Sequence, residues 1–284
     1  FSAGPSGGAM VSAFLAQRNG DRWGGVLMLI HGGNGIRPDP EVPLAFLVGE
    51  QDQVYPFAAV QRDYLGLREA GNTLRIESYP GLGHGGVPQA DAERMMDWLI
   101  DHARLTHPRL PEPARRQARE ASKARLKTAP AIADPGARRE EIERLVLLPK
   151  LTVFREADVR PVLDAWCAER LARIDAMADL RTRHFYLREL AGHPAAHLLA
   201  QTQRKAIQTR LDQCRTQSPV KEDWEAEQAF AQLPDIQHVT LEQSRQVIRA
   251  YEAFADKYPD THEGKRAAKI AEAFRAARRK AGGR

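Results

Sequence analysis

Short apolar runs separated by polar, glycine-rich segments fill the first third of the chain. Residues 25–30 and 43–49 are almost continuously apolar, as in parallel strands that are buried on both faces. Residues 73–79 alternate apolar and polar positions, which predicts a strand near a sheet edge. Helices are expected at residues 9–16, at 56–70 and around 95–100. This order predicts an α/β unit in which helices cover a parallel sheet.

The spacing of apolar residues changes in the remainder of the chain. From about residue 140 onward they recur with the period of a helix. One face holds Leu241, Ile248, Tyr251 and Phe254, and another holds Ala267, Ile270, Ala271 and Phe274. Residues 257–261, with a proline stop, predict a turn between these two helices. The stretch resembles a single tetratricopeptide-type helical hairpin, which implies a groove for a protein partner, while a plain helical bundle stays an equal alternative.

Composition separates the same two parts. Residues 1–107 hold 16 of the 21 glycines and no lysine, with a net charge of −4, whereas residues 108–284 carry a net charge of +9. Residues 108–139 mix prolines with a charged helical stretch and predict a linker. We therefore expect an α/β domain over 1–107, a linker over 108–139 and an all-α domain over 140–284.

Charge and hydropathy narrow the classes of partner. Basic residues in the second part alternate with acidic ones at helical spacing, and no zinc-finger spacing or aromatic-interleaved basic strand accompanies them, so we expect no nucleic-acid partner. No apolar run approaches the roughly 20 residues of a membrane span. Cys167 and Cys214 could be two buried thiols or one disulfide, and they leave the cellular compartment open.

Three chemically reactive residue types follow one another along the first part. A serine lies on a glycine-rich turn before the first helix, Asp52 follows one predicted strand, and His84 lies in the loop after the next. Reactive groups of parallel sheets gather beyond the carboxyl ends of the strands. A histidine can remove the proton of a serine hydroxyl when a carboxylate orients its ring. The order Ser, Asp, His therefore predicts a nucleophilic triad.

The segments FSAGPSGGAM, FLVGEQDQVYP and YPGLGHGG resemble the nucleophile elbow, acid and histidine segments of the α/β-hydrolase superfamily, especially its esterase, phospholipase/carboxylesterase and dienelactone-hydrolase-like branches. The resemblance implies a serine hydrolase that cleaves small-molecule carboxylic esters without a metal or an organic cofactor. It also implies that residues 1–107 are the C-terminal half of a hydrolase domain, because that family has further strands and an oxyanion loop before the elbow.

Two serines compete for the role of nucleophile. We favour Ser2, because Ala3 would then supply an oxyanion N–H and Pro5 would fall in the first helical turn, where its missing N–H is harmless. Ser6 is the alternative, since Gly4-Pro5-Ser6-Gly7-Gly8 reads as G-x-S-x-G. In that case a proline would precede the strained position.

Other histidines have simpler interpretations. His31-Gly32-Gly33 is similar to an oxyanion segment, but it follows the elbow and more simply ends a strand. His193 and His197 have zinc-like i, i+4 spacing without a third ligand, so no metal site is expected. A peptidase of the prolyl-oligopeptidase-like type could use the same triad, and a catalytically inactive hydrolase acting as a binding scaffold is the alternative from another class.

Overall fold

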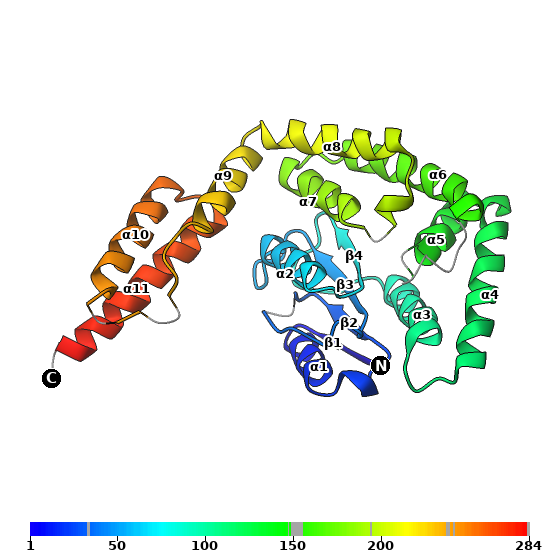
Figure 1. The fold of residues 1–284 in the computed structure, drawn as a ribbon, viewed down its shortest axis with the longest axis horizontal. Helices are drawn as coiled ribbons and strands as arrows, with labels where there is room; N and C mark the ends of the chain where they lie inside the picture. Colours follow the sequence, from blue (N-terminus) through cyan, green and yellow to red (C-terminus); the bar gives the residue numbers. More distant parts are fainter. Residues whose placement is uncertain are drawn as a thin grey trace. The chain divides into compact units, whose positions relative to one another are not determined.

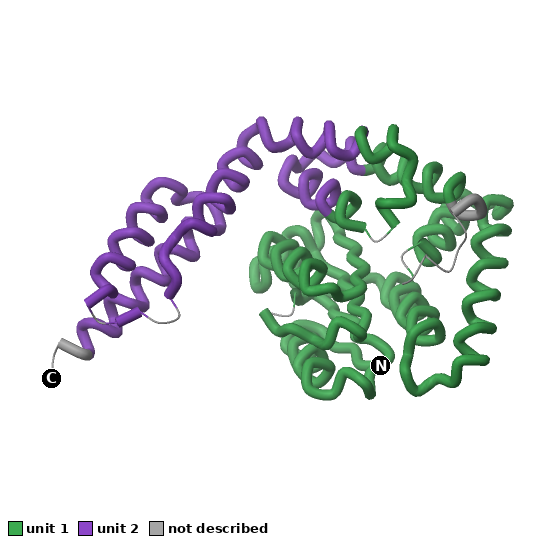
Figure 2. Tube along the Cα trace, in the orientation of Figure 1, with its two compact units in different colours: residues 1–173, 189–205 green, residues 174–188, 206–284 purple. Residues whose placement is uncertain are grey.

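The computed structural model describes residues 1–32, 35–146, 148, 156–193, 195–236, 239–240 and 242–282. They form two compact units, which Figure 2 distinguishes by colour. The first comprises residues 1–173 and 189–205, and the second comprises residues 174–188 and 206–284.

A four-stranded parallel sheet forms the centre of the first unit (Figure 1). Its strands lie in chain order, β1 (Ser2–Pro5), β2 (Val26–Leu29), β3 (Leu44–Gly49) and β4 (Leu74–Tyr79). The expected strands are present: the continuously apolar β2 and β3 are the inner ones, and the alternating β4 lies at an edge. The opposite edge is β1, a strand that the apolar pattern did not predict.

Helices cover both faces of this sheet. Figure 1 shows α1 (Gly7–Arg18) and α2 (Phe57–Glu69) on one side and α3 (Gln89–Thr106) on the other. Phe46 of β3 meets Tyr64 of α2 edge to face at 5.7 Å between ring centres, and Leu99 of α3 lies against Gly25 at the start of β2. The parallel sheet with helical layers agrees with the expected α/β class.

The predicted linker is structured and belongs to the first unit. Residues 108–139 contribute α4 (Glu112–Thr128), the 3₁₀ turn η2 (Ala129–Ala131) and the start of α5 (Pro135–Val146). Buried Asp101 of α3 accepts hydrogen bonds from Arg125 and Arg144, each at 2.8 Å. One carboxylate thus joins three helices, so the compact unit continues past the boundary we expected at residue 107.

Helices α6 (Glu156–Asp175), α7 (Leu180–Ala191) and α8 (Gln201–Arg215) complete the middle of the chain, with the 3₁₀ turn η4 (Ala196–Leu198) between the last two. The division between the units falls inside all three helices. Within the first unit, buried Glu189 binds Arg68 of α2 at 3.1 Å and Arg170 of α6 at 2.7 Å. Arg170 also pairs with Glu143 of α5, so a buried network of charges links these helices.

In the second unit, α9 (Val220–Phe230), α10 (Ser244–Lys257) and α11 (His262–Gly282) pack together. Their shared core holds Ala226, Val247, Tyr251, Phe254, Ala267 and Ala271. The expected turn separates α10 from α11, and the Thr261 hydroxyl accepts the Gly264 N–H at 3.0 Å to begin α11. A side chain at Gly264 would collide with the Tyr258 carbonyl. Leu241, which we assigned to the apolar face of α10, lies outside the described residues.

Two further expectations concern the cysteines and the membrane. Cys167 and Cys214 are both buried thiols rather than a disulfide. None of the helices in the described ranges is long and apolar enough to cross a membrane.

Candidate active site

Ser6 occupies a strained turn between β1 and α1. Its backbone has φ 49° and ψ −122°, and its N–H donates to the carbonyl of Leu29 at the end of β2 at 2.9 Å. Ile30, the next residue of that neighbouring chain segment, also has a positive φ of 51°. Positive φ is costly for residues with a side chain, and such strain clusters at functional sites. The carboxyl ends of β1 and β2 therefore hold two adjacent strained residues.

The glycines around Ser6 let the strand and the helix approach closely. A Cβ on Gly4 would lie 2.5 Å from the carbonyl carbon of Gly8 and 2.7 Å from its oxygen. Because both are backbone atoms, no rotamer change could relieve the contact. A Cβ on Gly7, by contrast, would meet nothing within 4 Å. Packing therefore requires glycine at position 4, the first glycine of G-x-S-x-G. Its missing side chain allows α1 to begin at Gly7, immediately after Ser6.

Ser6 is in the N-cap position of α1 but does not act as a cap. Serine at this position usually accepts a hydrogen bond from the first helical turn, whereas the Ser6 side chain makes no such bond. Its Oγ lies 3.0 Å from Nε2 of His84. The hydroxyl is thus directed to an imidazole.

Asp52 lies in the turn after β3 and is buried. Its Oδ1 accepts the backbone N–H groups of Val54 and Tyr55, each at 2.8 Å, and its Oδ2 lies 2.7 Å from Nδ1 of His84. Burial would raise the pKa of this carboxyl, but the hydrogen bonds from Tyr55, His84 and Val54 outweigh burial and hold the pKa below its ordinary value. Asp52 is therefore ionised at neutral pH and accepts a hydrogen bond from the N–H at Nδ1 of His84. Nε2 is then unprotonated and accepts the hydrogen bond of the Ser6 hydroxyl.

The His84 loop is fixed against the Asp52 turn. The N–H of Gln51 donates to the carbonyl of Leu82 at 3.0 Å, and a Cβ on Gly49 would collide with that same carbonyl. This close approach of two backbones after β3 and β4 brings His84 within reach of Asp52 on one side and Ser6 on the other. Ser6, Asp52 and His84, which are 46 and 32 residues apart in the sequence, thus meet at the carboxyl ends of the strands.

The structure does not support our preference for Ser2. Ser2 is the first residue of β1, and its Oγ donates to the hydroxyl of Ser12 in α1 at 2.8 Å. Because a strand advances about 3.3 Å per residue, Ser2 lies roughly 13 Å along the chain before Ser6. The serine that His84 contacts is instead Ser6, our alternative.

Ala3 and Pro5 were misplaced for the same reason, since both were assigned to the elbow and helix start. Ala3 lies inside β1 opposite Leu27, so its N–H is not the one that follows Ser6. Pro5 ends the edge strand, where a missing N–H leaves no ladder bond unmade, and the bond to β2 is made by Ser6 instead. The N–H that directly follows Ser6 belongs to Gly7 at the first position of α1, where helix N–H groups attract negative charge.

A second layer of side chains, not found by sequence reasoning, surrounds the Asp52 turn. The ring of Tyr55 stacks on His31 with 4.1 Å between centres, and its hydroxyl donates to Asp63 of α2. Burial lowers the pKa of His31, although Asp63 opposes this effect. His31 therefore lies next to the cluster rather than in it, and Gly33 of the H-G-G segment is outside the described residues.

His193 and His197 do not share a helix, because α7 ends at Ala191, and Nδ1 of His193 accepts the Ala195 N–H at 3.0 Å. In the described part of the chain, no group of three or more histidine, cysteine or acidic side chains is arranged to hold a metal ion.

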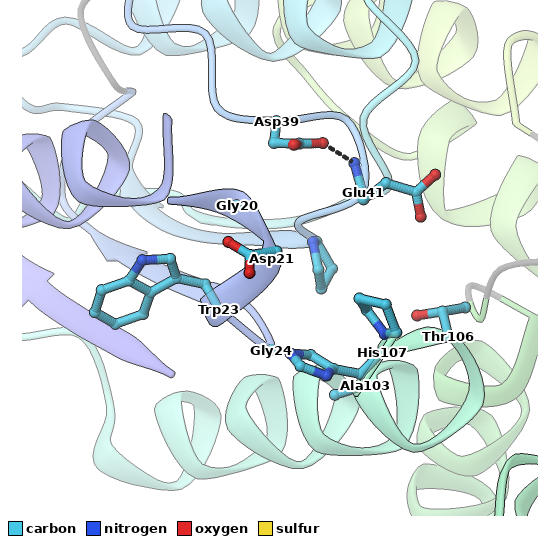
Figure 3. Close-up of a pocket in the computed structure, with 11 residues that line it drawn as sticks. Gly20, Asp21, Trp23, Gly24, Asp39, Glu41, Ala103, Thr106 and His107 are labelled. Carbon is cyan, nitrogen blue, oxygen red and sulfur yellow. Dashed lines mark hydrogen bonds between the residues drawn. The ribbon is translucent and has the colours of Figure 1, made fainter. Parts of the chain in front are cut away.

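A separate cavity of about 110 Å³ lies between the segments that precede β2 and β3 and the C-terminal end of α3 (Figure 3). Its lining includes Asp21, Trp23, Asp39, Glu41 and His107. None of the three clustered side chains lines this cavity, so it is distinct from the candidate active site.

Comparison of the chain with protein-family models, with curated proteins and with solved structures gives no match. The chemistry of the site therefore rests on its own geometry. A serine hydroxyl, an imidazole and an ionised carboxylate joined by hydrogen bonds of 3.0 and 2.7 Å can transfer a proton from the serine while it attacks an electrophilic carbon.

Proposed function

We propose that this chain belongs to a serine hydrolase that cleaves carboxylic esters, with Ser6 as nucleophile, His84 as general base and then acid, and Asp52 as the residue that orients His84. The observation that carries the proposal is the continuous hydrogen-bonded relay of these three side chains, which starts on a strained strand-to-helix turn. The α/β-hydrolase resemblance of the same segments supports it.

The proposed reaction proceeds through an acyl-enzyme. Ser6 Oγ attacks the ester carbonyl while Nε2 of His84 removes the hydroxyl proton, and the ionised Asp52 stabilises the imidazolium that forms. We assign the N–H of Gly7, at the start of α1, as a donor to the developing oxyanion, where one such donor is worth about 3 kcal/mol. His84 then protonates the leaving alcohol, and a water molecule activated by His84 releases the acid.

The helical second unit supports a separate role. Its core of α9, α10 and α11 belongs to the second unit, whereas Ser6, Asp52 and His84 belong to the first. We propose that it is an accessory module for a protein partner, as the tetratricopeptide-like hairpin of α10 and α11 suggests.

Labelling with a fluorophosphonate, followed by mass spectrometry of the modified peptide, tests the catalytic proposal. We expect label on Ser6, and we expect it to disappear in Ser6→Ala and in His84→Ala. Ser2→Ala is the matched control, because it removes a serine hydroxyl four residues away and should label like the parent chain. Folding of each variant is checked by circular dichroism. Absence of label on the folded protein without substitutions would refute the proposed hydrolase function. It would favour the alternative of a catalytically inactive hydrolase that acts as a binding scaffold.

Substrate class is tested with nitrophenyl esters of increasing acyl length and with peptide nitroanilides. We expect turnover of esters that is lost in Ser6→Ala. Turnover of the peptide nitroanilides with a kcat/KM equal to or greater than that of the esters would contradict the ester assignment. It would support the alternative in which the same three residues act as a peptidase.

A further inference from the structure

The Asp52 turn is held by few contacts of its own. Val54, which donates one of the two N–H groups to Asp52, is 69 % exposed and gives the turn no buried anchor. The Asp52 N–H donates to the Gly49 carbonyl over a long 3.4 Å, and the Gln51 N–H donates to the Leu82 carbonyl at 3.0 Å, so the backbone anchor of this turn lies before residue 52. Tyr55 donates the second N–H to Asp52 and is the residue of this turn whose side chain reaches two other segments.

The Tyr55 ring is held on two sides. His31, after β2, stacks on the ring with an interplanar angle of 22°, and Asp63 of α2 accepts a hydrogen bond from the phenol hydroxyl. A Cβ on Gly32 would lie 2.6 Å from a ring carbon, so this glycine makes room for the ring. The ring thus connects the segment after β2 with α2, while its own backbone N–H holds Asp52.

We propose that Tyr55 is a positioning residue, which sets the orientation of the Asp52 carboxylate through the turn at residues 52–55. This role rests on the proposed function, because it matters for catalysis only if the Ser6, His84 and Asp52 relay is used. The carboxylate that orients an imidazole must stay within a fraction of an ångström of its productive place. The bond between Tyr55 and Asp63 provides that rigidity from outside the relay.

The surrounding charges agree with this role. The Asp63 carboxyl accepts the hydrogen bond of the phenol hydroxyl, and burial lowers the pKa of His31, so at neutral pH His31 stacks as an uncharged ring. A neutral His31 brings no positive charge to compete with His84 for Asp52. A hydrogen bond to Asp63 and a ring contact with neutral His31 thus both hold Tyr55.

Tyr55→Phe tests the proposal, because it retains the ring and its stacking and removes only the hydroxyl. We expect kcat for ester hydrolysis to fall about 10- to 100-fold with KM little changed, as for a displacement on the order of 1 Å at a catalytic group. Tyr251→Phe is the matched control: it removes one tyrosine hydroxyl that donates to the Pro234 carbonyl in the second unit. Its kcat should stay within twofold of the parent value.

A double-mutant cycle identifies the bond responsible. If the Tyr55 and Asp63 bond carries the effect, Tyr55→Phe combined with Asp63→Ala loses no more activity than the more impaired single variant. Fully additive losses, or a Tyr55→Phe enzyme with parental kcat, would overturn the positioning role.

A readout independent of turnover separates this proposal from the proposed function. The proton shared by Nδ1 of His84 and Asp52 is observable by proton NMR in histidine-labelled protein and is assigned by its loss in Asp52→Ala. We expect this resonance to shift and to exchange faster with solvent in Tyr55→Phe than in Tyr251→Phe. An unchanged resonance refutes the positioning role even in an inactive protein. A changed resonance in a protein that takes no fluorophosphonate label supports the positioning role and refutes only the proposed hydrolase function.

Discussion

Gly4→Ala is the most direct test of how the chain places Ser6. The added Cβ would lie 2.5 Å from the carbonyl carbon of Gly8, whereas two carbon atoms in contact prefer about 3.5–4.0 Å. Strand β1 and helix α1 must therefore separate by about 1 Å. Overpacking of this kind costs about 1–3 kcal/mol.

The same displacement should impair Ser6 more than it impairs folding. Ser6 is the only residue between β1 and α1, so a change in their separation moves its Oγ relative to His84. A shift on the order of 1 Å corresponds to about a hundredfold loss of rate. We expect the rate of fluorophosphonate labelling to fall by that factor, together with a decrease of about 1–3 kcal/mol in the free energy of unfolding.

Gly7→Ala is the matched control, because it retains the backbone N–H of residue 7, its Cβ meets nothing within 4 Å, and alanine is the better helix residue by up to about 1 kcal/mol. Urea denaturation followed by circular dichroism gives the stabilities, and mass spectrometry gives the labelling rates. If Gly4→Ala and Gly7→Ala have equal stability and equal labelling rates, the close contact at Gly4 is not what positions Ser6.

Two further predictions concern the buried charges and the His84 loop. Burial raises the pKa of Glu189, but Arg170 and Arg68 lower it to about 2, so the stabilisation by this carboxylate is complete above its unfolded pKa of 4.5 and is lost as pH falls toward 2. Glu189→Gln should therefore reduce the free energy of unfolding by about 3 kcal/mol at pH 7, and urea titrations should show this difference shrinking between pH 4.5 and 2; a constant difference would contradict the ion-pair account. Gly49→Ala should slow labelling of the serine at least tenfold, because its Cβ would collide with the loop that carries the histidine, whereas Gly85→Ala, with nothing within 4 Å, should label normally. Equal rates for these two glycine variants would show that the loop contact is not required.

The sequence by itself determined the class of the first unit and two of the three clustered residues. The continuous apolar runs of β2 and β3 can be satisfied only by burial on both faces, and the alternating run of β4 fits an edge. Asp52 lies in the turn after β3 and His84 in the loop after β4, so the geometry of a parallel sheet brings their side chains together at the carboxyl ends of the strands. For Asp52 and His84, the local strand pattern and the sheet topology therefore predict the same position.

Only the tertiary structure decided between Ser2 and Ser6. The choice depends on where β1 ends, and a four-residue edge strand rich in small residues carries too little apolar signal to be recognised. Its register with β2 places the turn at Ser6, and contact with Gly8 explains why Gly4 is glycine.

The same holds for the residues that support the site. Tyr55 reaches Asp63 along α2 and His31 after β2, and nothing in the spacing of these residues indicates that they meet. Asp101 likewise joins α4 and α5 to α3, which turns an expected linker into part of the first unit. Strand and helix patterns arise from burial, which is encoded locally, whereas these contacts depend on how close whole elements come to one another, and that distance is set only when the core is packed.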